Sequence, residues 1–368
     1  MSVVGVVGGG QLARMMIPAA INLGIDLKVF GETDVASAHL AVTQVGDYAD
    51  FTQLARFAKG VDVLTFDHEH VPLEHLRALQ EQGTTVFPPP QALALTQDKT
   101  VMRSALEELD VPQPLWAVID DADDDAVSHV GNFPCIAKLP VGGYDGKGVR
   151  VVTQWSEIED WLEKGPVLLE ELVEFTRELA QLGARRPSGQ WQAWPVVETR
   201  QQGGVCAQVI SPAEGLNPSQ ASLANSLAEK IADTYGVVGV LAVELFEKPS
   251  GDIVVNELAM RPHNSGHIFT EQSDTSQFEQ HLRAVTDTAL GSTRLRDNTG
   301  IMINLFGSAE FSTWQQCAGD FPSVKFHSYQ KPSRPGRKAG HLALTGPTTA
   351  ETLSEALAAE GAYKGAHS

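Results

Sequence analysis

Long apolar runs, cysteines and basic residues are all scarce in this sequence, and each scarcity excludes a class of protein. No segment approaches the roughly 18 consecutive apolar residues that a membrane-spanning helix requires. The first ten residues lack the basic region and the cleavage-site pattern of a signal peptide, so their apolar run predicts a β-strand. We therefore expect no association with a membrane.

The three cysteines, Cys135, Cys206 and Cys317, are too few and too widely spaced for a disulfide framework, and they form no zinc motif. Buried, reduced thiols are the expectation, which favours a cytoplasmic location. The 27 basic residues are outnumbered by 46 acidic ones, which gives a formal net charge of -19. This balance argues against nucleic acid as a partner. A phosphate site would have to be built from a few local cations and backbone N–H groups.

Residues 1–97 alternate apolar strands with helical segments, a pattern typical of an α/β domain with a doubly wound parallel sheet. A helix is expected over residues 11–23, and the proline run at 88–90 marks the end of the region. Strands are expected at residues 3–7, 26–30, 61–66 and 84–87.

Residues 98–298 are richer in strands and indicate an α+β domain, and residues 299–368 form a third, small unit with an Ala-rich tail. Helices are expected over residues 98–109 and 218–235, and the acidic run at 120–125 is interpreted as a solvated loop. The strands expected in this middle domain are 136–139, 149–152, 167–172, 178–184, 194–199, 205–211, 240–246 and 253–258.

A glycine cluster directly follows the first strand. Residues 8–13 read GGGQLA and match the G-x-G-x-x-A turn that cradles phosphates in dinucleotide-binding folds. Glu32 ends the second strand, where an acid that binds ribose could lie. Three interpretations stay open here: a dinucleotide site, a loop on the substrate side, and tight turn geometry alone.

A second glycine-rich segment, residues 138–148, lies between two expected strands and reads KLPVGGYDGKG. Its glycines allow backbone N–H groups to approach phosphate oxygens, while Lys138 offsets their charge. No G-K-[ST] sequence opens a helix, so this is not a Walker loop. A plain hairpin is the alternative, although a hairpin needs only one or two glycines. The segment therefore predicts a nucleotide phosphate loop.

Two glutamates, Glu244 and Glu257, each lie late in an apolar strand. A carboxylate buried without a partner is costly, so its presence there requires a reason. Two carboxylates converging on one groove would bind Mg2+, a hard cation that prefers oxygen ligands and also contacts ATP phosphates. A buried ion pair is the alternative interpretation.

Three polar segments remain. Residues 261–267, RPHNSGH, follow the strand of Glu257 and predict a substrate-binding loop, with a structural turn as the alternative. Residues 331–341, KPSRPGRKAGH, concentrate four basic residues in an acidic protein and predict a phosphate clamp, with a solvated turn as the alternative. Residues 66–70, FDHEH, end the third strand, where α/β sheets bind ligands; substrate contact by Glu69 is favoured over a metal site.

These segments occur together in one order: GGGQLARM, FDHEHV, QDK, AKLPVGGYDGKG, VNELAMRPHNSGH and KPSRPGRKAGHL. In combination, over about residues 3–345, they resemble the 5-(carboxyamino)imidazole ribonucleotide synthases of the ATP-grasp superfamily. The resemblance implies an ATP-grasp domain preceded by a Rossmann-like, biotin-carboxylase-like domain and followed by a small C-terminal domain.

The resemblance also implies roles for residues in an ATP site, a Mg2+ site and a ribonucleotide site. The nucleotide would contact Lys99, Lys138, Gly143, Tyr144, Asp145, Gly146, Lys147, Gly148, Val149, Glu170, Glu171, Leu172, Val173, Glu178, Gln201, Asn256 and Glu257. Catalytic roles fall to Tyr144, Asp145, Lys147, Arg261, His263 and Asn264, and the metal to Glu244 and Glu257. The ribonucleotide would contact Gly10, Gln11, Leu12, Glu69, Lys331, Arg337 and Lys338.

Within these sets, residues 170–173 would be the adenine hinge, and Glu178 would bind the ribose hydroxyls. Gln201 stands where the family often has histidine, and Lys99 and Lys147 where it often has arginine. Strand alternation predicts that Asn256 points away from Glu257.

The implied reaction uses ATP to activate bicarbonate as carboxyphosphate, which carboxylates the amine of aminoimidazole ribonucleotide and leaves ADP and phosphate. A homodimer and a separate mutase that receives the product are further implications. Three other functions are weighed: a formate-dependent ribonucleotide transformylase, a nicotinamide oxidoreductase built on residues 8–13, and a non-catalytic nucleotide-binding module.

Overall fold

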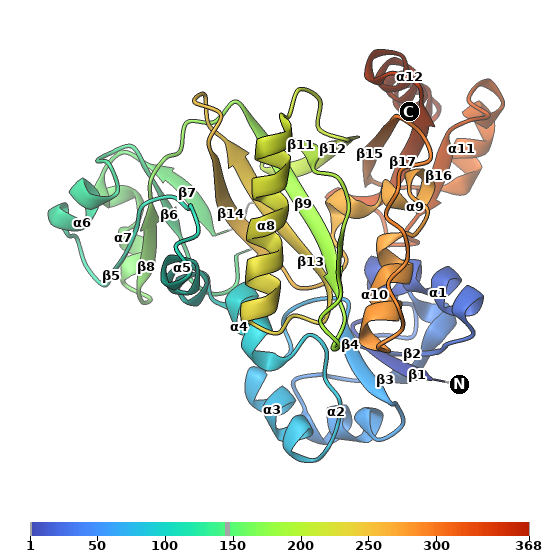
Figure 1. The fold of residues 1–368 in the computed structure, drawn as a ribbon, viewed down its shortest axis with the longest axis horizontal. Helices are drawn as coiled ribbons and strands as arrows, with labels where there is room; N and C mark the ends of the chain where they lie inside the picture. The colour runs from blue at the N-terminus through green and yellow to red at the C-terminus, as the bar shows by residue number, and fades with distance from the viewer. Residues whose placement is uncertain (1, 144–147, 368) are drawn as a thin grey trace.

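The computed structural model describes residues 2–143 and 148–367 and arranges their strands in three sheets (Figure 1). A small sheet forms a separate lobe at the left of the view. A large sheet fills the centre, and a parallel sheet lies below it near the N-terminus. No helix in the described ranges is long and apolar enough to cross a bilayer.

The N-terminal sheet is parallel, with strand order β3-β2-β1-β4. Its strands are β1 (Val3–Val7), β2 (Asp26–Gly31), β3 (Val42–Val45) and β4 (Val63–Phe66), and its helices are α1 (Gln11–Leu23), α2 (Phe51–Ala58) and α3 (Leu73–Glu81). The predicted doubly wound pattern is confirmed, because the strands are parallel and α1 packs in one core cluster while α2 and α3 pack in another.

One predicted strand in this region is wrong, and one observed strand was not predicted. The segment 84–87 makes only an isolated bridge between Leu64 and Val86, because the prolines that follow it have no N–H to continue a ladder. Strand β3 was not predicted, because its sequence lacks an apolar run. It lies at the edge of the sheet, where its side chains are half-buried or exposed.

Helices α4 (Pro90–Gln97) and α5 (Lys99–Glu108) connect the N-terminal sheet to the rest of the chain. The Asp98 carboxylate accepts hydrogen bonds from the backbone N–H of Thr100 at 2.8 Å and of Val101 at 3.4 Å. This side-chain cap satisfies donors that the first turn leaves open and fixes where α5 begins. Lys99 therefore stands in the first turn of a capped helix.

The small sheet has the order β5-β8-β6-β7 and is antiparallel. Its elements are β5 (Trp116–Ile119), α6 (Asp124–His129), β6 (Cys135–Lys138), β7 (Val149–Val152), α7 (Glu159–Leu162) and β8 (Val167–Glu170). The acidic run predicted as a loop is in part helical, since Asp123 caps α6 by accepting from the N–H of Asp125 and Ala126. One face of the sheet packs on α6 and α7 around Cys135, Val167 and Trp161.

The large sheet runs in the order β14-β13-β9-β11-β12-β15-β17-β16, with β10 beside β9. Helices α8 and α10 pack against it, and Figure 1 shows α8 in front of β9 and β13. The expected strand 194–199 instead begins at Val197 and extends to Gln202, because Pro195 cannot donate to a ladder. The elements are β9 (Arg177–Arg185), β10 (Trp191–Ala193), β11 (Val197–Gln202), β12 (Val205–Ser211), α8 (Pro218–Thr234), β13 (Gly239–Glu247), β14 (Ile253–Ala259), α9 (Phe269–Gln272) and α10 (Gln277–Val285).

The C-terminal segment extends this same sheet. Strand β15 pairs with β12 in antiparallel register, so hydrogen bonding continues across position 298. The Ala-rich tail forms a helix that packs on β15 and β17. The elements are β15 (Thr299–Gly307), α11 (Phe311–Cys317), β16 (Lys325–Ser328), β17 (Arg334–Gly346) and α12 (Thr349–His367).

Candidate active site

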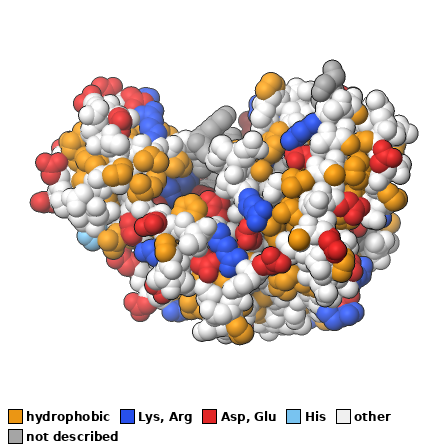
Figure 2. Space-filling model, turned by 90° about the horizontal axis from the view of Figure 1, so that it is seen from above, with side chains coloured by type: hydrophobic (Ala, Val, Ile, Leu, Met, Phe, Trp, Pro, Cys, Tyr) orange, Lys and Arg blue, Asp and Glu red, His pale blue; other side chains and the backbone are white. Residues whose placement is uncertain are grey.

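A cleft of about 400 Å³ lies between the small lobe and the large sheet. Figure 2 shows the molecule hollowed between a smaller and a larger lobe, with basic and acidic side chains gathered there. The structure brings predicted residues from distant segments to the wall of this cleft. They are Glu69, Lys99, Gly143, Gln201, Glu244, Glu257, Arg261, His263, Asn264 and Lys338.

The two predicted metal carboxylates face each other across the β13–β14 ladder, where Glu244 is the register partner of Glu257. Loss of solvent inside the cleft raises the pKa of Glu257, and the Glu244 charge raises it further. The same loss of solvent acts on Glu244, but a hydrogen bond from His263, 3.2 Å away, and nearby cations bring its pKa below the ordinary value. A like-charged pair held this close fits a divalent cation.

No cluster of three His, Cys, Asp or Glu ligands occurs within the described residues. Two protein carboxylates suit Mg2+, because this ion dehydrates reluctantly. Water and phosphate oxygens would fill its remaining coordination positions.

The ladder is irregular next to this pair. Leu245 pairs with Val255, so Asn256 is an extra residue in a β-bulge. A bulge interrupts the alternation of side chains. Strand alternation therefore does not place Asn256 on the face opposite Glu257.

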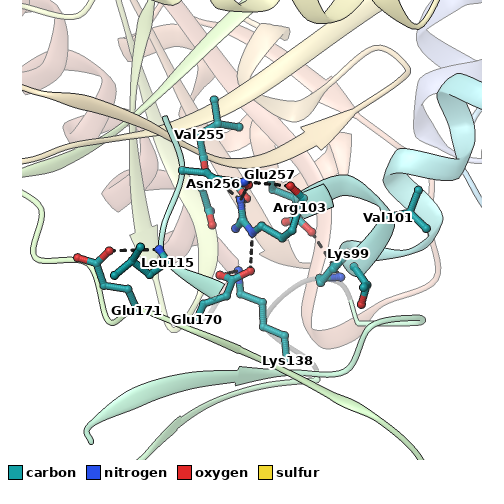
Figure 3. Close-up of polar contacts among 12 residues, drawn as sticks. Lys99, Val101, Arg103, Leu115, Lys138, Glu170, Glu171, Val255, Asn256 and Glu257 are labelled. Carbon is teal, nitrogen blue, oxygen red and sulfur yellow. Dashed lines mark hydrogen bonds and ion pairs between the residues drawn. The ribbon is translucent and has the colours of Figure 1, made fainter. Parts of the chain in front are cut away.

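Two lysines from different elements each pair with a glutamate, Lys99 with Glu257 and Lys138 with Glu170 (Figure 3). Lys99, on α5, places its Nζ 3.5 Å from Glu257 Oε1 and donates to the Gly143 carbonyl at 3.0 Å. Lys138, at the end of β6, lies 2.7 Å from Glu170 Oε2. Lys99 thus connects Gly143 of the predicted phosphate loop to a predicted metal ligand.

The register of the small sheet shows which side chains share a face with Lys138. Val149 pairs with Lys138, and the next aligned row on the same face joins Val151 to Ile136 and Glu170. Val149 and Val151 are 39% and 58% exposed, although valines in a sheet normally pack against a neighbour. An apolar face that also carries Lys138 can cover a flat aromatic base while its lysine contacts phosphate.

The predicted adenine hinge, residues 170–173, begins at the last residue of β8. The Glu170 side chain is buried and is held by Arg103 Nε at 2.7 Å and by Lys138, so only its backbone could contact a base. Burial opposes ionisation of Glu170, but the charges of Lys138 and Arg103 more than offset this and lower its pKa. The Glu171 N–H donates to the Leu115 carbonyl at 2.8 Å, so it is already engaged within the protein.

Glu178 and Gln201 come from neighbouring strands, β9 and β11. Burial raises the pKa of Glu178, and its hydrogen bond with Gln201 partly counters that shift. The nearby Glu244 also raises this pKa. The glutamine in the position where the family often has histidine therefore contacts the residue predicted to bind ribose.

A second cavity, of about 830 Å³, adjoins the cleft and shares Arg261, His263, Asn264 and Lys338 with it. Basic side chains gather on the β17 side, and the start of α1 forms the other wall. Lys331 Nζ donates to Gln11 Oε1 at 2.5 Å, which joins the two sides. The residues lining only this second cavity include Gly10, Gln11, Leu12, Asp67, Lys331, Arg334 and Arg337.

Asp67 is a residue of this cavity that sequence reasoning missed. Its Oδ1 accepts from the Ala13 N–H at 2.7 Å, at the N-terminus of α1, where the helix dipole favours negative charge. A Cβ on Gly10 would lie 2.0 Å from Asp67 Oδ2. The FDHEH segment signalled this acid, but nothing in the sequence shows that it meets Gly10.

Glu69, in the same segment, lines the nucleotide cleft. Its carboxylate accepts from the Met260 N–H at 2.7 Å and from Arg261 Nε at 3.1 Å. These contacts hold the Arg261 guanidinium at the junction of the two cavities. Contact between Glu69 and a substrate ring remains a prediction.

The dinucleotide interpretation of residues 8–13 conflicts with the packing. The Glu32 carboxylate accepts from the Gly9 N–H at 3.2 Å and lies 3.5 Å from His68 Nε2, and the His68 imidazole lowers the pKa of Glu32 to about 2. A Cβ at Gly8 would come within 2.5 Å of His68. His68 thus occupies the space beside the turn and engages the acid that a ribose would need.

Four predicted site residues, Tyr144, Asp145, Gly146 and Lys147, lie outside the described residues. Gly143 and Gly148 on either side are described, and Gly148 has φ +69°, a left-handed conformation that glycine adopts without strain.

This geometry defines the class of protein: two sheets enclosing a cleft with a glycine-rich segment, two lysines and paired carboxylates are the arrangement of an ATP-grasp protein. An ATP-grasp domain matches residues 104–278, a ribonucleotide synthetase preATP-grasp domain residues 1–97, and a phosphoribosylaminoimidazole carboxylase C-terminal domain residues 300–355. The chain belongs to the N5-carboxyaminoimidazole ribonucleotide synthase family.

Curated relatives and solved structures agree with this membership. The synthase of Mycobacterium tuberculosis is 46% identical over 367 residues, which cover 96% of this chain and 86% of that protein. The synthase of Corynebacterium ammoniagenes is 44% identical and covers 97% and 90%. An Aspergillus clavatus synthase structure with ADP and 5-aminoimidazole ribonucleotide has a TM-score of 0.89 at 28% identity and covers 99% and 98%. The expected family and fold are confirmed.

Proposed function

We propose that the protein uses ATP and bicarbonate to carboxylate the amine of 5-aminoimidazole ribonucleotide in purine biosynthesis, with release of ADP and phosphate. The observation that carries this proposal is the junction of two cavities at Arg261, His263 and Asn264. One cavity has the lysines and carboxylates that suit a nucleotide with its metal. The other has the basic side chains that suit a ribonucleotide phosphate.

In the nucleotide cleft, the exposed valines of β7 would cover the adenine and the backbone of residues 170–173 would contact its edge. Lys99 and Lys138 would hold phosphate oxygens, because Lys99 lines the cleft and Lys138 ends a strand of the small sheet beside it. Glu244 and Glu257 would hold Mg2+, which when bound offsets charge on the transferred phosphoryl group.

At the junction, three side chains are held in place by their neighbours. Arg261 is fixed by Glu69, and His263 Nδ1 lies 2.8 Å from Ser265 Oγ while its Nε2 faces Glu244. The Asn264 amide exchanges hydrogen bonds with Asn304. Donors fixed in this way can bind bicarbonate and stabilise the developing carboxyphosphate charge without reorganising during the reaction.

In the second cavity, Lys331, Arg337 and Lys338 would clamp the ribonucleotide phosphate, with Gly10, Gln11 and Leu12 at the N-terminus of α1 on the opposite wall. This geometry would place the amine toward the junction, where the activated bicarbonate forms. Enclosure of the junction limits hydrolysis of that reactive species.

The domain boundaries 1–97, 98–298 and 299–368 remain part of the proposal, as do a cytoplasmic location, a homodimer and transfer of the product to a separate mutase. The homodimer is checked by light scattering of the purified protein, with a monomeric mass as the contradicting result.

The decisive experiment measures ADP release from Mg-ATP and bicarbonate, with and without 5-aminoimidazole ribonucleotide. We expect strong stimulation by the ribonucleotide, and loss of that stimulation in Glu257→Ala. Stimulation by formate in place of bicarbonate would contradict the proposal and favour a ribonucleotide transformylase.

A further inference from the structure

Arg103 is a fully buried cation that no predicted role uses. It lies on α5 with an exposed fraction of 0%, and its guanidinium has four hydrogen-bond acceptors. On one side, Nε donates to Glu170 Oε1 at 2.7 Å. On the other, the terminal nitrogens donate to the carbonyls of Val255 at 3.1 Å and Asn256 at 2.8 Å. The fourth acceptor is Gln113 Oε1, at 3.4 Å.

These contacts join two sheets that share no strand ladder. Glu170 ends β8 in the small sheet and is the first residue of the predicted adenine hinge. Val255 and Asn256 belong to β14 in the large sheet, immediately before Glu257. Figure 3 shows Arg103 between these two groups, with Lys138 on the far side of Glu170. A nucleotide bound with its base at the hinge and its phosphates at Glu257 would span the same gap.

Helix α5 carries a second contact of the same kind. Lys99 stands four residues before Arg103, so both side chains leave the same face of the helix, one turn apart. Lys99 pairs with Glu257 at 3.5 Å, while Arg103 pairs with Glu170. One rigid helix therefore contacts the phosphate end of the cleft through Lys99 and the adenine end through Arg103.

We propose that Arg103 is a positioning residue that sets the spacing between the adenine hinge and the metal-binding carboxylate. It has no route to the nucleotide itself, because its donors are directed into the protein. It acts through Glu170, which in turn holds Lys138, and through the backbone that carries Glu257. A lysine cannot replace it, since a single ammonium cannot reach the carboxylate and both carbonyls in the planar fork geometry.

The test compares nucleotides of different length. In Arg103→Lys and Arg103→Gln, titration calorimetry measures the affinities of AMP, ADP and a non-hydrolysable ATP analogue with Mg2+. AMP needs only the hinge end, so we expect its affinity to change less than about threefold. The ATP analogue must engage both ends at once, so we expect a loss of about tenfold or more. The KM for the ribonucleotide should stay unchanged while kcat falls.

Arg185→Lys provides the matched control. Like Arg103, Arg185 forms an ion pair through its Nε, with Asp233 at 2.6 Å, but it lies at the end of β9 and lines neither cavity. It should leave all three affinities unchanged. Arg103→Lys keeps a positive charge opposite Glu170. If Arg103→Gln does not fold, the affinities are compared in Arg103→Lys alone.

Two outcomes would overturn the proposal. An equal loss for AMP and the ATP analogue would mean that Arg103 only supports the hinge. A lower unfolding temperature with unchanged affinities would mean that its role is structural alone. The inference rests on the proposed nucleotide cleft, and failure of that cleft is distinguishable, because the unaltered protein would then bind none of the three nucleotides.

Discussion

Glu244 and Glu257 lie directly opposite each other across the β13–β14 ladder, although like charges in that position destabilise a sheet. Burial raises the pKa of Glu257, and the charge of Glu244 raises it further. An arrangement that costs stability without a ligand and suits a divalent cation is typical of a functional site.

Replacing Glu257 with Gln should raise the stability of the metal-free protein but lower its activity. Removal of one of the two charges should raise the stability of the metal-free protein by up to about 1 kcal/mol. It should also abolish the rise in unfolding temperature that Mg2+ with ADP produces, and reduce turnover at least about a hundredfold. Thermal unfolding with and without Mg2+ and ADP measures both effects. A variant that the metal still stabilises normally would contradict the assignment.

Gly10→Ala should impair ribonucleotide binding. Gly10 has φ -79° and ψ -164°, which alanine can adopt, so the cost comes from the 2.0 Å approach of the new Cβ to Asp67. The start of α1 must then move, and we expect the KM for the ribonucleotide to rise about tenfold while the KM for ATP stays the same. Steady-state kinetics with each substrate varied in turn measures this.

Gly24→Ala is the control for that variant. Gly24 has φ +67° at the C-terminus of α1, and an added Cβ would meet nothing within 4 Å. It should lower stability by about 1 kcal/mol through backbone strain and leave both KM values unchanged. Equal KM effects in the two variants would show that the Asp67 contact is not the cause.

Lys338→Ala should weaken ribonucleotide binding more than nucleotide binding. Lys338 lines both cavities, but the other basic residues of its segment line only the second one. We expect the KM for the ribonucleotide to rise about tenfold to a hundredfold, with partial recovery in Lys338→Arg. Lys164→Ala, at a 73% exposed side chain on the small lobe, should change nothing. An unchanged KM in Lys338→Ala would remove it from the phosphate clamp.

Stability should fall in acid because a histidine is buried in its neutral form. His281 accepts from the Val240 N–H at Nδ1, its Nε2 lies 2.8 Å from Thr65 Oγ1, and burial lowers its pKa to about 3. Between about pH 6.5 and pH 3, His281 is protonated in the unfolded chain but neutral in the folded protein. The free energy of unfolding therefore rises with pH across this window. The contribution is complete above pH 6.5 and is lost progressively as the pH falls toward 3.

Urea unfolding at pH 7.5 and 5.5 measures this effect. His281 should account for a loss of about 1.4 kcal/mol between the two values. His281→Gln is expected to be less stable at both pH values but to lack that part of the difference. An unchanged pH dependence in the variant would show that another group is responsible; His267 and His341, whose pKa values burial also lowers, are the alternatives.

The sequence predicted features that depend on neighbours along the chain. Asp98 marks the start of α5 because an N-cap needs only donors two and three residues ahead. The glycine-rich segment and the strands of Glu244 and Glu257 were visible for the same reason, since strand patterning and glycine content are local. The wrong strand at 84–87 shows the limit, because an apolar segment beside prolines cannot complete a ladder.

What the sequence by itself determined is the order of the elements, the residue types at the site and, through the resemblance of its motifs, the family. Only the tertiary structure decided that Arg103 joins Glu170 to β14, that Asp67 meets Gly10, and that the C-terminal strands extend the large sheet. These contacts join residues tens to hundreds of positions apart. Such pairings depend on sheet register and on burial, which no local pattern encodes.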